Sequence, residues 1–143
     1  MTNDVLKLFV YGSLRSGFKH PAYEYISRHF TLIDHAKVKG KLYDLGSYPA
    51  AIPTTDDDFY IVGELYQLKN EKEFDWAFEQ LDDYEGVHPE NDEKSLYTRQ
   101  KATVDIGGEH AVAWIYWYND VIEDHPLIAS GDVLEFIQHK SKL

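Results

Sequence analysis

The sequence predicts an α+β fold built around a mostly β core, and three observations lead to this prediction. Several segments alternate apolar and polar residues with a period of two, as half-buried strands do. Two other segments combine helix-start signals with apolar residues at helical spacing. The helical segments lie between groups of strands instead of alternating regularly with them, which is typical of α+β domains.

The first half of the chain contains three of the expected strands and one helix. Residues 6–11 (LKLFVY) form an apolar run that Gly12 and Ser13 bring to an end, so a buried strand is expected there. Pro21 stands where a first helical residue would, ahead of a short helix with apolar residues up to Phe30. Residues 36–43 and 60–68 alternate as strands do.

A second helix is expected after Asn70, which forms a plausible capping pair with Glu73. Successive residues of a helix are turned by about 100°, so four side chains of this segment point within roughly 60° of one another. They form an apolar stripe that includes one carboxylate. The members of this stripe are Phe74, Phe78, Leu81 and Glu85. Gly86 follows as a candidate C-cap. Beyond it, residues 97–106 and 109–118 alternate on either side of two glycines, which favours a tight hairpin.

Composition narrows the class of protein. The chain has 143 residues with no linker or repeat, so one domain over 1–143 is expected. It lacks cysteine, which excludes disulfides and thiolate chemistry. A net charge of −11 disfavours nucleic-acid binding, and no apolar run approaches the ~20 residues of a membrane span. The N-terminus does not resemble a signal peptide, so a cytoplasmic protein is expected.

The loop after the first strand is one candidate for chemistry. Residues 11–17 (YGSLRSG) end the strand in glycine and small polar residues, whose backbone N–H groups can hold an anion or a polarised carbonyl oxygen. The loop matches neither a Walker A motif nor GxGxxG. Pattern alone favours an ordinary strand-to-helix turn over an anion-binding loop.

Glu85 is the second candidate, because it continues the apolar stripe of its helix. Loss of hydration raises the pKa of a carboxyl group, and the negative end of a helix dipole acts in the same direction. A carboxylate of raised pKa suits general acid–base catalysis near neutrality. If the helix instead ends at Asp82, Glu85 is a solvated loop residue, and periodicity alone leaves both alternatives open. A glycosidase-like pairing with Asp82 or Asp83 is disfavoured because their helical directions diverge from that of Glu85.

Several motifs in order along the chain resemble those of the γ-glutamylcyclotransferase-like superfamily, especially its small single-domain members of the γ-glutamylamine cyclotransferase and avirulence-induced-gene-like type. The combination of YGSL with LDxxEG in this order is specific. The resemblance covers about residues 6 to 118 and rests on residues 8–17 (LFVYGSLRSG), 40–52 (GKLYDLGSYPAAI), 62–68 (VGELYQL), 81–87 (LDDYEGV), 97–99 (YTR) and 113–116 (AWIY).

The resemblance implies a compact mixed β-barrel with a few flanking helices. It also implies an enzyme that cyclises a small γ-glutamyl amide to 5-oxoproline and releases a free amine or amino acid. The family's catalytic glutamate corresponds to Glu85, which would act as general acid and base. The implied substrate-binding residues are Tyr11, Gly12, Ser13, Leu14, Tyr97 and Tyr116.

For Tyr97 and Tyr116, a plain role as core strand aromatics is the alternative to substrate binding. No metal or organic cofactor is implied, and the expected partner is a small γ-glutamyl substrate, with no nucleic acid or membrane. The alternative function is a non-catalytic module that binds a carboxylated or amino-acid-like small molecule. The terminal Ser141-Lys142-Leu143 matches a peroxisomal address, which we interpret as coincidence.

Overall fold

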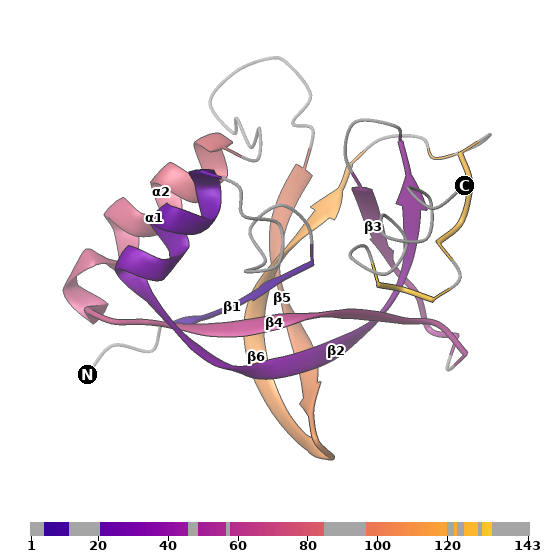
Figure 1. The fold of residues 1–143 in the computed structure, drawn as a ribbon, viewed down its shortest axis with the longest axis horizontal. Helices are drawn as coiled ribbons and strands as arrows, with labels where there is room; N and C mark the ends of the chain where they lie inside the picture. Colours follow the sequence, from indigo (N-terminus) through magenta and orange to yellow (C-terminus); the bar gives the residue numbers. More distant parts are fainter. Residues whose placement is uncertain are drawn as a thin grey trace.

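The computed structural model describes residues 5–11, 21–45, 49–56, 58–84, 97–119, 122, 125–128 and 130–132. Figure 1 shows the arrangement of the elements in this part of the chain. They are β1 (Lys7–Val10), α1 (Pro21–His29), β2 (Phe30–Asp44), β3 (Pro49–Pro53), β4 (Tyr60–Leu68), the 3₁₀ turn η2 (Glu71–Glu73), α2 (Phe74–Tyr84), β5 (Tyr97–Ile106) and β6 (Glu109–Tyr118).

Five strands form a closed barrel, in the order β2-β4-β1-β6-β5, with β5 returning to β2. The first strand of the chain, β1, is central: it runs antiparallel to β4 and parallel to β6. The barrel closes where Lys37 of β2 pairs with Asp105 of β5. The sixth strand, β3, pairs with the last part of β2, from Gly40 to Asp44. The expected α+β barrel with flanking helices is therefore confirmed.

The side chains of β1 divide between two hydrophobic clusters that the described residues form, because successive strand residues point to opposite faces. Phe9 and Tyr11 belong to an interior cluster inside the barrel, with residues of β2, β4, β5 and β6. Leu8 and Val10 belong to an outer cluster between the barrel wall and the helices. Figure 1 shows α1 and α2 lying together on this side of the barrel, where Tyr25 of α1 donates its hydroxyl to the carbonyl of Ala77 in α2.

Glycines shape the barrel at two places. Gly63 of β4 faces β1 so closely that an added Cβ would lie 2.6 Å from Cζ of Phe9 and closer still to the carbonyl oxygen of Val10. Gly107 and Gly108 join β5 to β6 with φ values of 59° and 94°, the left-handed region that glycine reaches without strain. The predicted hairpin with its glycine turn is therefore confirmed, and its two strands pair over their full lengths.

Two expectations about the first half of the chain need correction. Phe30 was expected on the first helix, but it begins β2, where it pairs with Leu68 and packs edge-to-face on Phe78. Residues 31–35 of this strand are all exposed and include a register shift between Leu32 and Asp34, so they lack the alternation that reveals a strand. The short strand β3 was not predicted at all, because its sequence, PAAIP, does not alternate.

The second helix agrees with its expected start. The side chain of Asn70 accepts a hydrogen bond from the backbone N–H of Lys72 at 3.0 Å and caps η2, which leads directly into α2. The helix is described as far as Tyr84, so the expected C-cap Gly86 lies outside the described residues. In the part of the chain that the structure describes, no helix is long and apolar enough to cross a membrane.

Candidate active site

Tyr116 of β6 connects two parts of the protein that the sequence analysis placed at the site. It is buried, with 3% of its surface exposed. Its backbone carbonyl accepts a hydrogen bond of 2.6 Å from the hydroxyl of Tyr11, the residue that follows β1. Its own hydroxyl donates to Oδ1 of Asp82 in the last turn of α2, at 2.7 Å. One residue of β6 therefore holds both the end of β1 and the end of α2.

Asp82 is also held by Arg99 of β5, in a two-point contact. Nε of Arg99 lies 2.7 Å from Oδ1 of Asp82, and its terminal nitrogen donates to Oδ2 at 3.1 Å. Both side chains are only about one-fifth exposed, which reduces the screening of this ion pair by water. Such a fork geometry fixes direction as well as distance. The Asp82–Arg99 pair therefore fixes the orientation of the last turn of α2 relative to β5.

Aromatic rings position Arg99 in turn. Its guanidinium lies 4.5 Å from the ring centre of Trp114 and 5.0 Å from that of Phe78. A guanidinium over aromatic faces is stabilised by the ring quadrupoles and keeps its donors in the plane that meets the carboxylate. The ring of Phe78 belongs to α2 and that of Trp114 to β6, so Arg99 sits where helix and barrel wall meet.

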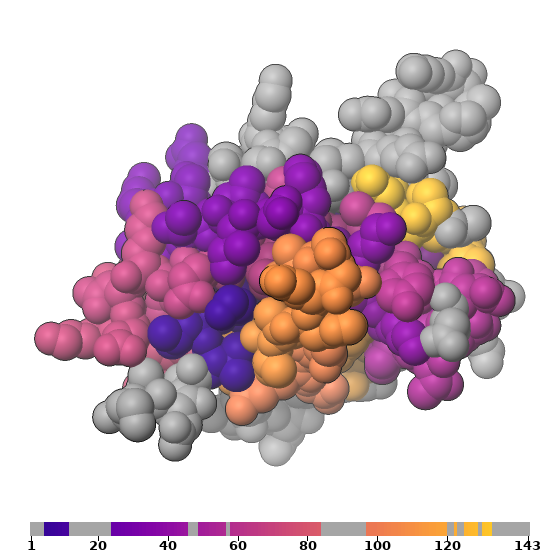
Figure 2. Space-filling view, turned by 90° about the horizontal axis from the view of Figure 1, so that it is seen from below, coloured from indigo at the N-terminus to yellow at the C-terminus, as the bar shows by residue number. Residues whose placement is uncertain are grey.

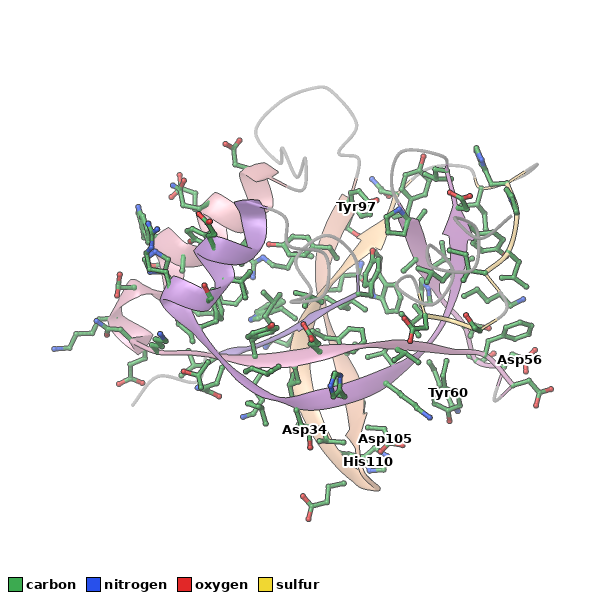
Figure 3. All side chains as sticks on the ribbon, in the orientation of Figure 1. Asp34, Asp56, Tyr60, Tyr97, Asp105 and His110 are labelled. Carbon is green, nitrogen blue, oxygen red and sulfur yellow. The ribbon has the colours of Figure 1, made fainter. Side chains whose placement is uncertain are left out.

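Tyr97, the first residue of β5, makes contacts on the side of β3. Its hydroxyl donates to the carbonyl of Pro49 at 2.6 Å, and its ring packs against Tyr118 with centroids 5.6 Å apart. Figure 3 shows Tyr97 at the end of β5, near β3. The contact with Pro49 links the start of β5 to β3, which contains the last residues of the 40–52 motif. Tyr97 and Tyr116 both belong to the outer cluster.

Glu64 is a buried carboxylate beside the end of β1. It pairs with Val10 across β1 and β4, and only 2% of its surface is exposed. Its Oε1 accepts a hydrogen bond of 2.9 Å from the hydroxyl of Tyr66. Burying a carboxylate is costly unless hydrogen bonds compensate for lost hydration. A buried carboxyl group at this place, next to the strand that leads into the 12–14 loop, is therefore a candidate for a functional role.

The structure brings together some of the predicted site residues and leaves others outside its description. Tyr11 and Tyr116 are in direct contact, while Tyr97 lies further along the barrel rim with its own partner, Pro49. All three are buried. Tyr97 and Tyr116, whose alternative role is that of core strand aromatics, belong to the outer cluster, and the substrate-binding role of all three stays a prediction. Four predicted residues lie outside the described residues: Gly12, Ser13, Leu14 and Glu85.

The sequence analysis missed the role of Asp82. It treated this residue as pointing away from the apolar stripe, yet Asp82 is the acceptor for both Arg99 and Tyr116. The available signal was its position four residues after Phe78, which places it about 40° from that side chain on a helix. Glu64 was also missed, because a carboxylate on the face of β4 that carries Tyr66 and Leu68 resembles an ordinary exposed residue in the sequence.

Metal binding has no candidate in the described part of the chain: no three His, Cys, Asp or Glu side chains there are grouped to hold an ion. The expectation of a cofactor-free protein remains a prediction.

Comparison with known proteins decides the family. A family model described as gamma-glutamyl cyclotransferase, AIG2-like, matches residues 8–135, which is most of the chain. The chain belongs to this family. The resemblance of the motifs to γ-glutamylcyclotransferases is thereby confirmed.

Relatives within the AIG2-like cyclotransferase family share modest identity with this chain. The gamma-glutamylcyclotransferase family protein YtfP of Escherichia coli K12 is 29% identical over 130 residues, 91% of this chain and 97% of the relative. The solution structure of ytfP from E. coli superposes with a TM-score of 0.60 and 26% identity, covering 92% of this chain and 98% of that one.

Two other proteins that this chain resembles are longer than it is. The gamma-L-glutamyl-butirosin B gamma-glutamyl cyclotransferase of Niallia circulans is 28% identical over 113 residues, 78% of this chain and 66% of the relative. The crystal structure of YkqA from Bacillus subtilis superposes with a TM-score of 0.70 and 25% identity. It covers 96% of this chain, which spans only 42% of YkqA.

Proposed function

We propose that this protein is a γ-glutamyl cyclotransferase that acts on a small γ-glutamyl amide. In the proposed reaction the substrate's α-amino nitrogen attacks its own γ-carbonyl carbon and forms the five-membered ring. The bond from that carbon to the leaving nitrogen breaks. The products are 5-oxoproline and a free amine or amino acid. Family membership and the names of relatives support cyclotransferase activity, whereas the substrate and the residue roles are proposals.

The observation that carries the proposal is the double engagement of Tyr116. Its carbonyl holds Tyr11, immediately before the 12–14 loop, and its hydroxyl holds Asp82, three residues before Glu85. The motifs assign one of these segments to substrate binding and the other to proton transfer. Tyr11, at the start of the first, and Asp82, in the second, thus both contact Tyr116. This proximity is what a reaction between a bound γ-glutamyl group and a general base requires.

In the proposed mechanism Glu85 takes a proton from the α-ammonium or amine group and later gives it to the leaving nitrogen. General acid–base action of this kind contributes on the order of 10²–10⁴-fold. The backbone N–H groups of Gly12, Ser13 and Leu14 stabilise the negative charge that develops on the carbonyl oxygen, a contribution of about 2.7–4 kcal/mol per donor. Nucleophile and electrophile belong to one molecule, so the enzyme mainly folds the substrate and moves protons.

The three tyrosines complete the proposed substrate site. Each donates its phenolic hydrogen inside the protein, to Tyr116, Pro49 or Asp82. We assign Tyr11, Tyr97 and Tyr116 to the frame of the site, in the substrate-binding role that the family motifs imply. The proposal further assigns 1–143 to one domain and places the reaction in the cytoplasm.

The test is a panel of γ-glutamyl amines and γ-glutamyl dipeptides, with release of 5-oxoproline as the measurement. We expect turnover of at least one compound, and a loss of about 10²–10⁴-fold in kcat for E85Q, which keeps the size of the side chain but cannot act as a base. The matched control is E79Q, because Glu79 is an exposed carboxylate of α2.

Two results would contradict the cyclotransferase. One is no 5-oxoproline from any compound, and the other is equal turnover by E85Q and the wild type. Thermal stabilisation by the same compounds without product, unchanged in E85Q, would instead support the alternative of a non-catalytic binding module.

A further inference from the structure

The β5–β6 hairpin carries a row of cross-strand pairs on its outer face, where α2 packs. Arg99 pairs with Tyr116, and two positions further along the same face Tyr97 pairs with Tyr118. In the opposite direction the next outer residue of β6 is Trp114. The aromatic residues of this row belong to the outer cluster or pack against it. We call Tyr97 and Tyr118 the tyrosine pair.

The helix α2 runs along this row toward the tyrosine pair. The ring of Phe78 lies 6.3 Å from that of Trp114, and four residues later Asp82 contacts Arg99 and Tyr116. Four helical residues rise about 6 Å, and two strand residues span about 6.8 Å, so one turn of the helix advances by about one cross-strand pair. The chain that follows Asp82 is therefore directed toward the tyrosine pair.

The tyrosine pair is aromatic and partly open to solvent. The two rings meet edge to face, with centroids 5.6 Å apart and planes inclined by 69°. Tyr97 is buried, and its hydroxyl donates to the carbonyl of Pro49. Tyr118 is only half-buried. Of the two rings, that of Tyr118 therefore has surface left for a ligand.

The tyrosine pair lies at the end of the hairpin that is remote from its turn. Figure 3 labels Tyr97 at this end, with Tyr60 of β4 well below it. Figure 2, seen from below, shows the opposite end, where the orange hairpin reaches the surface. Tyr60 is therefore a suitable control: it is an exposed tyrosine outside this end of the hairpin.

We infer that Tyr118 binds the leaving group of the substrate and selects a leaving amine that carries an aromatic ring. The inference rests on the proposed cyclotransferase function, in which Glu85, three residues after Asp82, gives a proton to the leaving nitrogen. A leaving group that receives this proton extends toward the tyrosine pair. Aromatic rings attract one another in edge-to-face and offset arrangements, beyond the contribution of the buried area. Tyr118 is thus a specificity-determining residue.

The first measurement compares γ-glutamyl amides that differ only in the leaving amine, with release of 5-oxoproline as the readout. The benzylamide carries an aromatic ring, and the cyclohexylmethylamide carries a saturated ring with the same number of carbon atoms. We define the ring preference as kcat/KM for the benzylamide divided by kcat/KM for the cyclohexylmethylamide. The two amines differ in basicity, which affects every variant alike, so the ring preference is compared between proteins.

Three variants show whether Tyr118 is responsible. Y118L keeps an apolar side chain without the ring, and its ring preference should fall by about threefold to tenfold. Y118F loses only the hydroxyl and should keep the ring preference within about twofold. Y60L is the matched control, because it loses an exposed ring, and it should also stay within about twofold. The ring preference is a ratio, so it does not depend on how much of each variant is folded.

A second measurement needs no variant. Free benzylamine and free cyclohexylmethylamine are both cations at neutral pH, and they are compared as competitive inhibitors of the wild-type protein. We expect the inhibition constant of benzylamine to be lower by about threefold to tenfold.

Three results would overturn the subsite and leave the cyclotransferase intact. They are an equal ring preference in Y118L and the wild type, an equal loss in Y118L and Y60L, and equal inhibition by the two amines. No 5-oxoproline from any γ-glutamyl compound would instead overturn the cyclotransferase itself, and the subsite with it.

Discussion

Tyr11 donates its hydroxyl hydrogen to the backbone carbonyl of Tyr116, 105 positions later in the chain, across 2.6 Å. The bond joins the end of β1 to β6, and the side chain of Tyr116 continues the connection to Asp82 of α2. The segments that carry the YGSL and LDxxEG motifs are therefore attached to the same residue of the barrel. Substitutions at this connection should affect the proposed reaction even though none of them alters Glu85.

Asp82→Asn should lower both stability and turnover. The substitution leaves the guanidinium of Arg99 without its charged partner, at a cost of about 1–3 kcal/mol in the free energy of unfolding. Because the last turn of α2 loses its fixed direction, kcat should fall by about tenfold to a hundredfold. Denaturant unfolding and 5-oxoproline release are the measurements. The control is D83N, an exposed neighbour that should change stability by less than about 0.5 kcal/mol. Equal effects of the two variants would contradict this role of Asp82.

The two hydrogen bonds at Tyr116 should differ in strength. Tyr116→Phe removes a donor to a carboxylate and should cost about 1.5–3 kcal/mol, while Tyr11→Phe removes a donor to a neutral carbonyl and should cost about 0.5–1.5 kcal/mol. Unfolding in urea measures both. A double-mutant cycle of Y116F with D82N should show a coupling of about 0.5–3 kcal/mol, whereas additive effects would mean that the contact contributes nothing.

Local patterns in the sequence were sufficient for much of the fold. The alternation in 97–106 and 109–118 and the two glycines between them predict the hairpin that is observed, and Asn70 marks the start of the second helical segment. Residues 31–35 could not be predicted as a strand, because their pairing with β4 is non-local and their exposed side chains carry no period. The closing of the barrel between Lys37 and Asp105 is likewise a long-range contact without a local signal.

The site was predictable only in part. The motifs identify Tyr11, Tyr116 and Glu85 by resemblance, but not the partners that hold them. Asp82 meets Arg99 only after α2 has packed on the barrel, so a helical wheel shows its direction and not its contact. The structure supplied that contact, while the role of Glu85 stays a prediction.

Gly63→Ala should destabilise the barrel by about 1–3 kcal/mol or more, because the new methyl group would overlap the carbonyl of Val10 and the ring of Phe9. Thermal or denaturant unfolding measures the effect. Gly107→Asn is a suitable control: this turn position has a φ of 59°, which asparagine tolerates, and nothing lies within 4 Å of an added Cβ. A G63A protein as stable as the wild type would show that β1 and β4 do not approach so closely.

Stability should decrease in strongly alkaline solution through Tyr25. Burial, with a smaller contribution from the charge of Glu73, raises the pKa of the Tyr25 phenol from 10.0 to about 12. The folded protein then holds this proton more tightly than the unfolded chain. The stabilisation of the folded state by the protonated Tyr25 phenol is complete below about pH 10 and is lost as the pH rises through about 12. Ionisation also removes the hydrogen that Tyr25 donates to Ala77.

Tyr25→Phe should therefore show a shallower loss of stability over that range than the wild type. Urea unfolding at several pH values measures the two slopes, and the difference at neutral pH gives the cost of the missing hydrogen bond alone. Parallel curves for the two proteins would contradict the assignment to Tyr25.

The central place of β1 has a consequence for how the protein is made. This strand is synthesised before the other described strands, yet one of its two neighbours, β6, is the last of them. Until β6 has been synthesised, Leu8 and its apolar neighbours cannot pack against the complete barrel. A topology that pairs strands far apart in the sequence folds slowly and exposes hydrophobic surface during translation. Truncation before Tyr118 should therefore yield a chain that aggregates or requires chaperones, instead of a smaller folded protein.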